Sequence, residues 1–193
     1  MSSVVKILVV GPTKAGKSTI ANIIGELADG PSETYRPTVG CRIVELERDP
    51  PPAVASFGKF TLELWDVSGD FKYEKCWGPI QKEAHGIIFV YDPAAPNYEE
   101  SLAQFVNMFP KAMMLSPKFC LAFANHHNIG AGNEPPRVAV PKCMDALDKH
   151  NGSAEETNGI FQAFEKYLIK LLKMLGDKQK EEEESMMNWS MCG

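Results

Sequence analysis

The chain has 193 residues, of which 44% are hydrophobic and 23% are charged, and its formal net charge is −5. This length accommodates one domain with a full core. The acidic balance argues against a nucleic-acid partner, because phosphate backbones are bound by clustered Lys and Arg. The five cysteines lie far apart without C-x-x-C spacing, which predicts reduced thiols in a cytoplasmic protein.

The first third of the chain has the pattern of a sheet whose opening strand ends in a glycine loop. Residues 4–10 form a continuous β-branched run and predict a central parallel strand that is buried on both faces. Residues 18–27 predict a helix. Strands are expected at 40–47 and 59–66, and the proline-rich stretch between them is too short for a crossover helix. These two strands should therefore form an antiparallel hairpin.

The rest of the chain continues the alternation of strands and helices. Short apolar runs at 87–91 and 119–124, with a helix expected at 98–115, form a βαβ unit. A last, weak strand is expected within 142–149. Apolar residues recur at steps of one, three and four over 160–175 and predict an amphipathic helix that packs on the sheet. The sequence predicts an α/β fold with a six-stranded, mainly parallel sheet, one antiparallel strand and helices on both faces.

The C-terminal segment has a different character. Residues 177–193 are charged and aperiodic, and we expect them to form an acidic flexible tail after a domain of residues 1–176. Prenylation patterns are missing, because Cys192 stands alone and Ser190 occupies the place that a C-a-a-X cysteine would take. The glutamates at 181–184 would be repelled by an anionic membrane surface. The sequence thus predicts no stable membrane anchor.

A phosphate-binding loop follows the first strand. The segment of residues 11–18 matches G-x-x-x-x-G-K-[ST] between a predicted strand and a predicted helix. Backbone N–H groups of such a loop, with the helix N-terminus, form a concave site for a polyphosphate. Lys17 would reach the β- and γ-phosphates, and the Ser18 hydroxyl would bind Mg²⁺. The nucleotide-binding residues predicted here are Gly11, Pro12, Thr13, Lys14, Ala15, Gly16, Lys17, Ser18 and Thr19.

Two further segments fit the switches of a nucleotide-dependent protein. Asp66, at the end of an alternating strand, would hold Mg²⁺ through water, and the amide of Gly69 would meet a γ-phosphate. Thr38, in the loop before the second strand, would supply a second hydroxyl ligand for Mg²⁺ when a triphosphate is bound. In isolation, D-x-x-G is usually a turn and Thr38 the start of a strand. Their positions after the phosphate-binding loop favour the functional interpretation.

These motifs, in this order and with a closing helix, resemble the Ras superfamily of small GTPases and its Rab-like branch. The resemblance is greatest to a divergent Rab-like family of intraflagellar transport, through Cys76-Trp77, Ala84-His85-Gly86 and His126-His127. It implies a P-loop NTPase G domain that binds GTP or GDP with Mg²⁺. It also implies a place in the cytoplasm and at the cilium or flagellum and its base. The implied partners are the coiled-coil intraflagellar transport proteins 74 and 81, in complex B.

Two departures from the active-GTPase pattern concern hydrolysis. Asp70 stands where the family has a glutamine that positions the attacking water. Thr13 stands where Ras commonly has glycine, and it would press on the γ-phosphate region. We therefore expect very slow or absent GTP hydrolysis and assign no catalytic residue.

A third departure concerns the base. The guanine-reading Asn-Lys-x-Asp appears here as Asn125-His126-His127-Asn128, and Asn125, His126 and Asn128 are the expected base-site residues. An asparagine amide at the last position accepts hydrogen bonds only through its oxygen. Base specificity should be weaker than in the family. The two histidines are not expected to bind metal, because adjacent side chains diverge and no third ligand is evident.

The leading interpretation is a nucleotide-bound binding module rather than an efficient enzyme. A P-loop nucleoside or nucleotide kinase is the first alternative, although no Arg-rich lid is found. A prenylated Rab-type regulator of vesicle traffic is the second, and the C-terminal segment argues against it.

Overall fold

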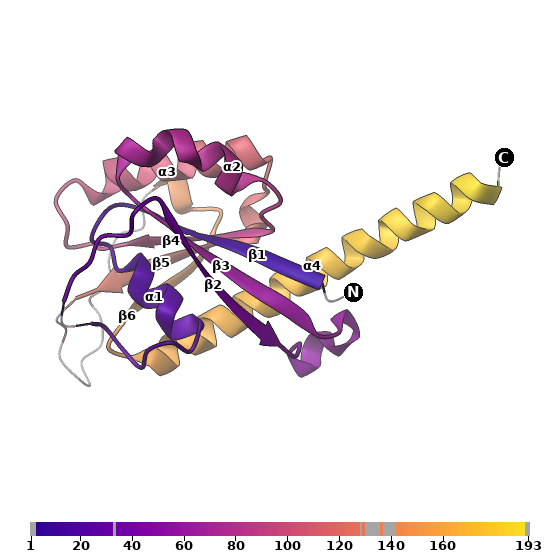
Figure 1. The fold of residues 1–193 in the computed structure, drawn as a ribbon, viewed down its shortest axis with the longest axis horizontal. Coiled ribbons are helices and arrows are strands. Elements are labelled where there is room, and N and C mark those ends of the chain that lie inside the picture. Colours follow the sequence, from indigo (N-terminus) through magenta and orange to yellow (C-terminus); the bar gives the residue numbers. More distant parts are fainter. Residues whose placement is uncertain (1–2, 33, 128, 130–135, 137–141, 192–193) are drawn as a thin grey trace.

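The structure, a computed structural model, describes residues 3–32, 34–127, 129, 136 and 142–191 (Figure 1). The described chain forms a six-stranded sheet in the order β2-β3-β1-β4-β5-β6. Its strands are β1 (Ser3–Val10), β2 (Cys41–Arg48), β3 (Phe60–Val67), β4 (Gly86–Tyr91), β5 (Cys120–His126) and β6 (Asp148–Ser153). The edge strand β2 is antiparallel to β3, and the other neighbours pair in parallel. The predicted fold class is confirmed.

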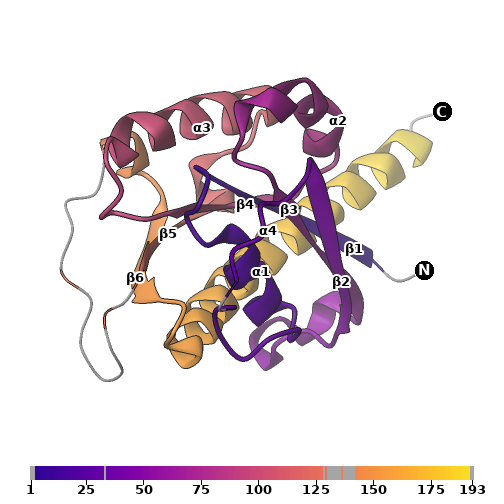
Figure 2. The same cartoon turned by 60° about the vertical axis from the view of Figure 1, so that its left-hand side comes forward.

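Helices cover both faces of this sheet (Figures 1 and 2). Successive side chains of a strand point to opposite faces, and β1 shows how this divides the core. Val5, Ile7 and Val9 pack in a core with α1 (Lys17–Ile24) and α4 (Thr157–Met191). Leu8 and Val10 pack in a second core with α2 (Trp77–Gln81) and α3 (Tyr98–Met113). From Val5 on, the apolar run of the first strand is therefore buried on both faces, as predicted for residues 4–10, whereas Val4 is exposed.

The amphipathic pattern expected over 160–175 is the part of α4 that packs on the sheet. Phe164, Leu168, Leu171 and Leu172 are buried there. Tyr167 lies among them, and its hydroxyl donates a hydrogen bond to the carbonyl of Phe119 at 2.8 Å.

Two elements differ from the predicted ones in place or existence. The strand expected within 142–149 is β6, which begins later, at Asp148. Its sequence DKHNGS has no apolar run, so pairing with the buried strand β5 and not periodicity decides its position. The short helix α2 was not expected because it contains Gly78 and Pro79. None of the helices described is both long and apolar enough to span a bilayer.

The C-terminal segment differs more. In place of a flexible tail from residue 177, α4 continues through Gly176 to Met191 and projects from the body at the yellow end of Figure 1. The described side chains at 181 and 184–187 are exposed. Glu, Lys and Met are strong helix formers, and a helix that packing has already nucleated extends at little further cost. The absence of an apolar period therefore did not prevent the helix.

Removal of residues 181–193 tests this extension. The shortened protein should lose helical ellipticity at 222 nm, while its unfolding free energy should change by less than about 0.5 kcal/mol, because exposed surface positions contribute little. Circular dichroism and thermal unfolding of both proteins at equal concentration measure the two quantities. Equal ellipticity per molecule would show that the segment is not helical in solution.

Candidate nucleotide-binding site

The phosphate-binding loop connects β1 to α1 and depends on two glycines. Gly11 has a φ of 144°, and a Cβ at this position would lie 2.0 Å from the carbonyl oxygen of Val90. Gly16 precedes α1 with a φ of 90°, and a Cβ there would lie 2.2 Å from Nδ2 of Asn125. L side chains rarely adopt such φ values. Glycine therefore lets the loop lie directly over the ends of β4 and β5.

Lys17 carries a buried cation beneath this loop. The residue is only 6% exposed, and its Nζ donates a hydrogen bond to the carbonyl of Pro12 at 2.6 Å. Burial lowers the pKa of Lys17 to about 8, and the nearby Asp66 carboxylate partly opposes this shift. A desolvated ammonium interacts more strongly with an anion than one in water does. The loop thus presents a strong point charge to a polyphosphate.

Three oxygen-bearing side chains from separate segments meet beside the loop. Oγ of Ser18, on α1, lies 2.8 Å from Oγ1 of Thr38, in the loop before β2. Thr38 Oγ1 donates to Oδ2 of Asp66, near the end of β3, at 3.2 Å. Asp66 is fully buried, and its Oδ1 has no hydrogen-bond partner among the described residues. A hard cation such as Mg²⁺ takes oxygen ligands, so two hydroxyls and a carboxylate with a spare oxygen fit it.

Gly69 lies against the phosphate-binding loop. A Cβ at this position would lie 2.4 Å from the carbonyl oxygen of Gly11 and 2.7 Å from the amide nitrogen of Thr13. Any side chain would therefore push the second switch away from the loop. The D-x-x-G motif thus brings its glycine against the phosphate-binding loop.

Asp70 is held by its own segment. Its Oδ1 accepts a hydrogen bond from the backbone N–H of Lys72 at 3.0 Å, and its Oδ2 pairs with Nζ of Lys72 at 2.7 Å. These hydrogen bonds from Lys72 lower the pKa of Asp70 below its ordinary value. At neutral pH the residue that replaces the family glutamine is therefore an ionised carboxylate, anchored to the 3₁₀ segment Phe71–Cys76.

Asn125 joins the base side of the site to the loop. It is fully buried, its Nδ2 donates to the carbonyl of Ala15 at 3.0 Å, and its Oδ1 accepts from the backbone N–H of Ala154 at 3.0 Å. Next to it, Nε2 of the buried His126 lies 2.6 Å from Oδ1 of Asn151 on β6. Asn128 lies outside the described residues.

Sequence reasoning missed three contributors to this region. Ala154, just after β6, contacts Asn125, and Asn151 contacts His126. Both were missed because β6 has no apolar signal, so the residues near its end could not be aligned with the other strand ends. Arg42 was missed because one arginine on an edge strand is an ordinary surface residue. Its Nη2 lies 3.5 Å from Oδ2 of Asp66.

The chain is similar to known proteins over most of its length. The model of the ADP-ribosylation factor family matches residues 1–163. The intraflagellar transport protein 22 homolog of Danio rerio is 33% identical over 184 residues, covering 95% of this chain and 98% of the relative. Its human counterpart is 32% identical, covering 94% and 97%. The chain belongs to the intraflagellar transport protein 22 family of small GTPases.

A solved structure extends the comparison. The GTP-bound crystal structure of Trypanosoma brucei intraflagellar transport proteins 22, 74 and 81 contains a chain with 27% sequence identity and a TM-score of 0.70, covering 91% of this chain and 99% of that one. The resemblance to the Ras superfamily, and within it to Rab-like protein 5, which is intraflagellar transport protein 22, is confirmed.

Replacement of Lys17 by methionine should move stability and nucleotide binding in opposite directions. The pKa of Lys17 is lowered in the folded protein. Below pH 8 its buried charge therefore reduces the free energy of unfolding. The wild type regains this stability as the pH rises above about 8, because the folded protein then loses the proton first. Without nucleotide, Lys17→Met should be more stable than the wild type at pH 7, by roughly 1–3 kcal/mol. It should nevertheless retain no nucleotide, because the phosphates lose their charged partner.

Denaturant unfolding of the nucleotide-free proteins and nucleotide content after purification measure these two effects. Lys59→Met, at an exposed lysine beside β3 that pairs with Glu47, is the control and should leave nucleotide content unchanged. Normal nucleotide content in Lys17→Met would refute the assignment of the loop.

Proposed function

We propose that this protein is a GTP-bound subunit of the intraflagellar transport complex B, with very slow or no intrinsic hydrolysis. The observation that carries the proposal is the meeting of Ser18, Thr38 and Asp66 beside the buried Lys17. These residues come from the loop and both switches. A triphosphate with Mg²⁺ is the ligand class that needs all of them together.

Each part of the site has a role in this proposal. The backbone N–H groups of residues 11–18 and the ammonium of Lys17 bind the phosphates. Ser18 and Thr38 would hold Mg²⁺ directly, and Asp66 would hold it through water. Mg²⁺, when bound, neutralises charge on the β- and γ-phosphates. Asn125 fixes the loop against the base side.

The two switch segments form the proposed partner-binding surface. Thr38 and Gly69 contact or approach the phosphate-binding loop, so a γ-phosphate would order both of their segments. In the GTP-bound Trypanosoma brucei structure a similar chain is assembled with intraflagellar transport proteins 74 and 81. We infer that the ordered switches of this chain form a surface for the corresponding coiled-coil pair, at the cilium or flagellum and its base.

Bound nucleotide and partner are tested in one experiment. The protein is purified gently, its nucleotide is identified by mass spectrometry, and capture by the coiled-coil pair 74 and 81 is measured for the wild type and Lys17→Met. GTP in the wild type, and capture of the wild type alone, are expected. Bound ATP, or phosphoryl transfer to a nucleoside, would instead support a P-loop kinase.

Hydrolysis should be no faster than the slow intrinsic rate of Ras, of order 10⁻⁴ s⁻¹. Asp70 stands where the family has a water-positioning glutamine, and its carboxylate is instead tied to Lys72. Single-turnover assays with checked nucleotide occupancy measure the rate for the wild type, Asp70→Gln and the double variant Asp70→Gln with Thr13→Gly. The double variant should be the fastest of the three. Rapid turnover by the wild type alone would show that another residue positions the water.

A further inference from the structure

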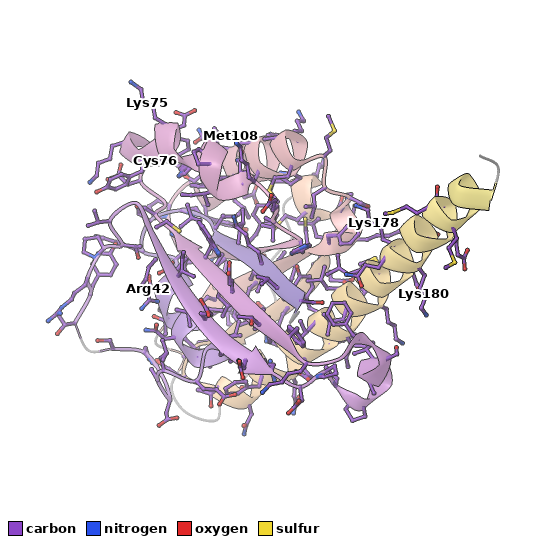
Figure 3. All side chains as sticks on the ribbon, turned by 45° about the vertical axis from the view of Figure 1, so that its right-hand side comes forward. Arg42, Lys75, Cys76, Met108, Lys178 and Lys180 are labelled. Atoms are coloured by element: carbon purple, nitrogen blue, oxygen red, sulfur yellow. The ribbon has the colours of Figure 1, made fainter. Side chains whose placement is uncertain are left out.

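A guanidinium lies beside the proposed magnesium ligands. Arg42 is near the start of β2, and its Nη2 lies 3.5 Å from Oδ2 of Asp66 and 3.5 Å from the carbonyl oxygen of Ser18, to which it donates. Its side chain is 42% exposed, whereas that of Asp66 is fully buried. Figure 3 labels Arg42 on this edge of the sheet. The side chain therefore reaches from solvent to the buried carboxylate.

The carboxylate of Asp66 needs a nearby positive charge. A buried charge without a partner costs considerable free energy. The ammonium of Lys17 attracts Asp66 but donates its hydrogen bond to the carbonyl of Pro12. Among the described residues, Arg42 is the cation that forms an ion pair with Asp66.

Arg42 and a magnesium ion would share this carboxylate. Asp66 Oδ2 already faces both Arg42 and Thr38, while Oδ1 is unpartnered. Two cations beside one carboxylate repel each other. Arg42 should therefore weaken the hold of the site on Mg²⁺. When the metal leaves, the positive charge of Arg42 remains and still compensates the carboxylate of Asp66 beside the phosphates.

We propose that Arg42 is a positioning residue that makes nucleotide retention less dependent on Mg²⁺. It holds the carboxylate of Asp66 beside Ser18 and Thr38 and replaces part of the charge that the metal supplies. The inference rests on the proposed nucleotide site and concerns the role of metal within it.

The test measures release of a fluorescent guanine nucleotide as a function of free Mg²⁺. Arg42→Gln removes the charge but keeps a polar side chain of moderate length, and Arg42→Lys keeps the charge but loses the planar donor group. Arg48→Gln is the matched control, because Arg48 lies at the other end of β2 and pairs with Glu165 at 3.4 Å. Thermal unfolding verifies that each variant is folded.

At saturating Mg²⁺ all four proteins should release nucleotide at rates within about twofold of one another. In excess chelator, Arg42→Gln should release it about tenfold faster than the wild type, which corresponds to about 1.4 kcal/mol. Its apparent affinity for Mg²⁺ should be at least roughly threefold higher, since the repelling charge is gone. Arg42→Lys should fall between the two, and Arg48→Gln should match the wild type.

Three outcomes would overturn the inference. The first is an unchanged Mg²⁺ dependence in Arg42→Gln. The second is the same acceleration at every Mg²⁺ concentration, which would mean that Arg42 only supports the loop. The third is a wild type that binds no guanine nucleotide, which would overturn the proposed function as well, whereas the first two leave that function standing.

Discussion

The buried carboxylate of Asp66 is the interaction on which the rest of the site depends. It lies near the end of β3, which pairs with β1 and with the edge strand β2, and it meets Thr38 from one switch and Arg42 from the edge strand. Thr38 in turn lies against Ser18 of the phosphate-binding loop. Because the carboxylate is fully buried, each of these groups is held by the need to compensate its charge. The loop, the first switch and β2 are thereby joined at one point.

The fold places this point where ligands bind in parallel sheets. Strands β1, β3, β4 and β5 run in the same direction, so their carboxyl ends meet at one edge of the sheet. The phosphate-binding loop follows β1, Asp66 lies near the end of β3, and Asn125 near the end of β5. Gly11 and Gly69 allow these ends to touch, because a Cβ at either position would meet backbone atoms.

In the proposed function, the departures from the GTPase pattern separate binding from catalysis. The groups suited to holding phosphate and metal, such as Lys17 and Ser18, are present with ordered contacts. The position of the water-orienting glutamine instead holds Asp70, tied to Lys72. An anionic group beside a γ-phosphate adds no stabilisation to a transition state that is itself rich in negative charge. This contrast supports the proposal that the site keeps GTP as a structural signal for partners.

Hydrogen bonds join the elements on the base side, although the sequence there departs from the family motif. Asn125 keeps hydrogen bonds to Ala15 and Ala154, while His126, in the place of the family lysine, pairs with Asn151 on β6. These hydrogen bonds connect the phosphate-binding loop, β5 and β6 without a contribution from Asn128.

The sequence by itself determined the fold class, and it predicted the phosphate-binding loop and both switches. Their signals are local: a β-branched run before a glycine loop, and an aspartate at the end of an alternating strand. Only the tertiary structure decided the features that depend on strand pairing and on burial. It placed β6, whose sequence DKHNGS has no apolar period, beside β5, and it extended α4 to Met191. It also brought Arg42 to Asp66, since contact between residues on two different strands depends on sheet register, and no single segment contains that information.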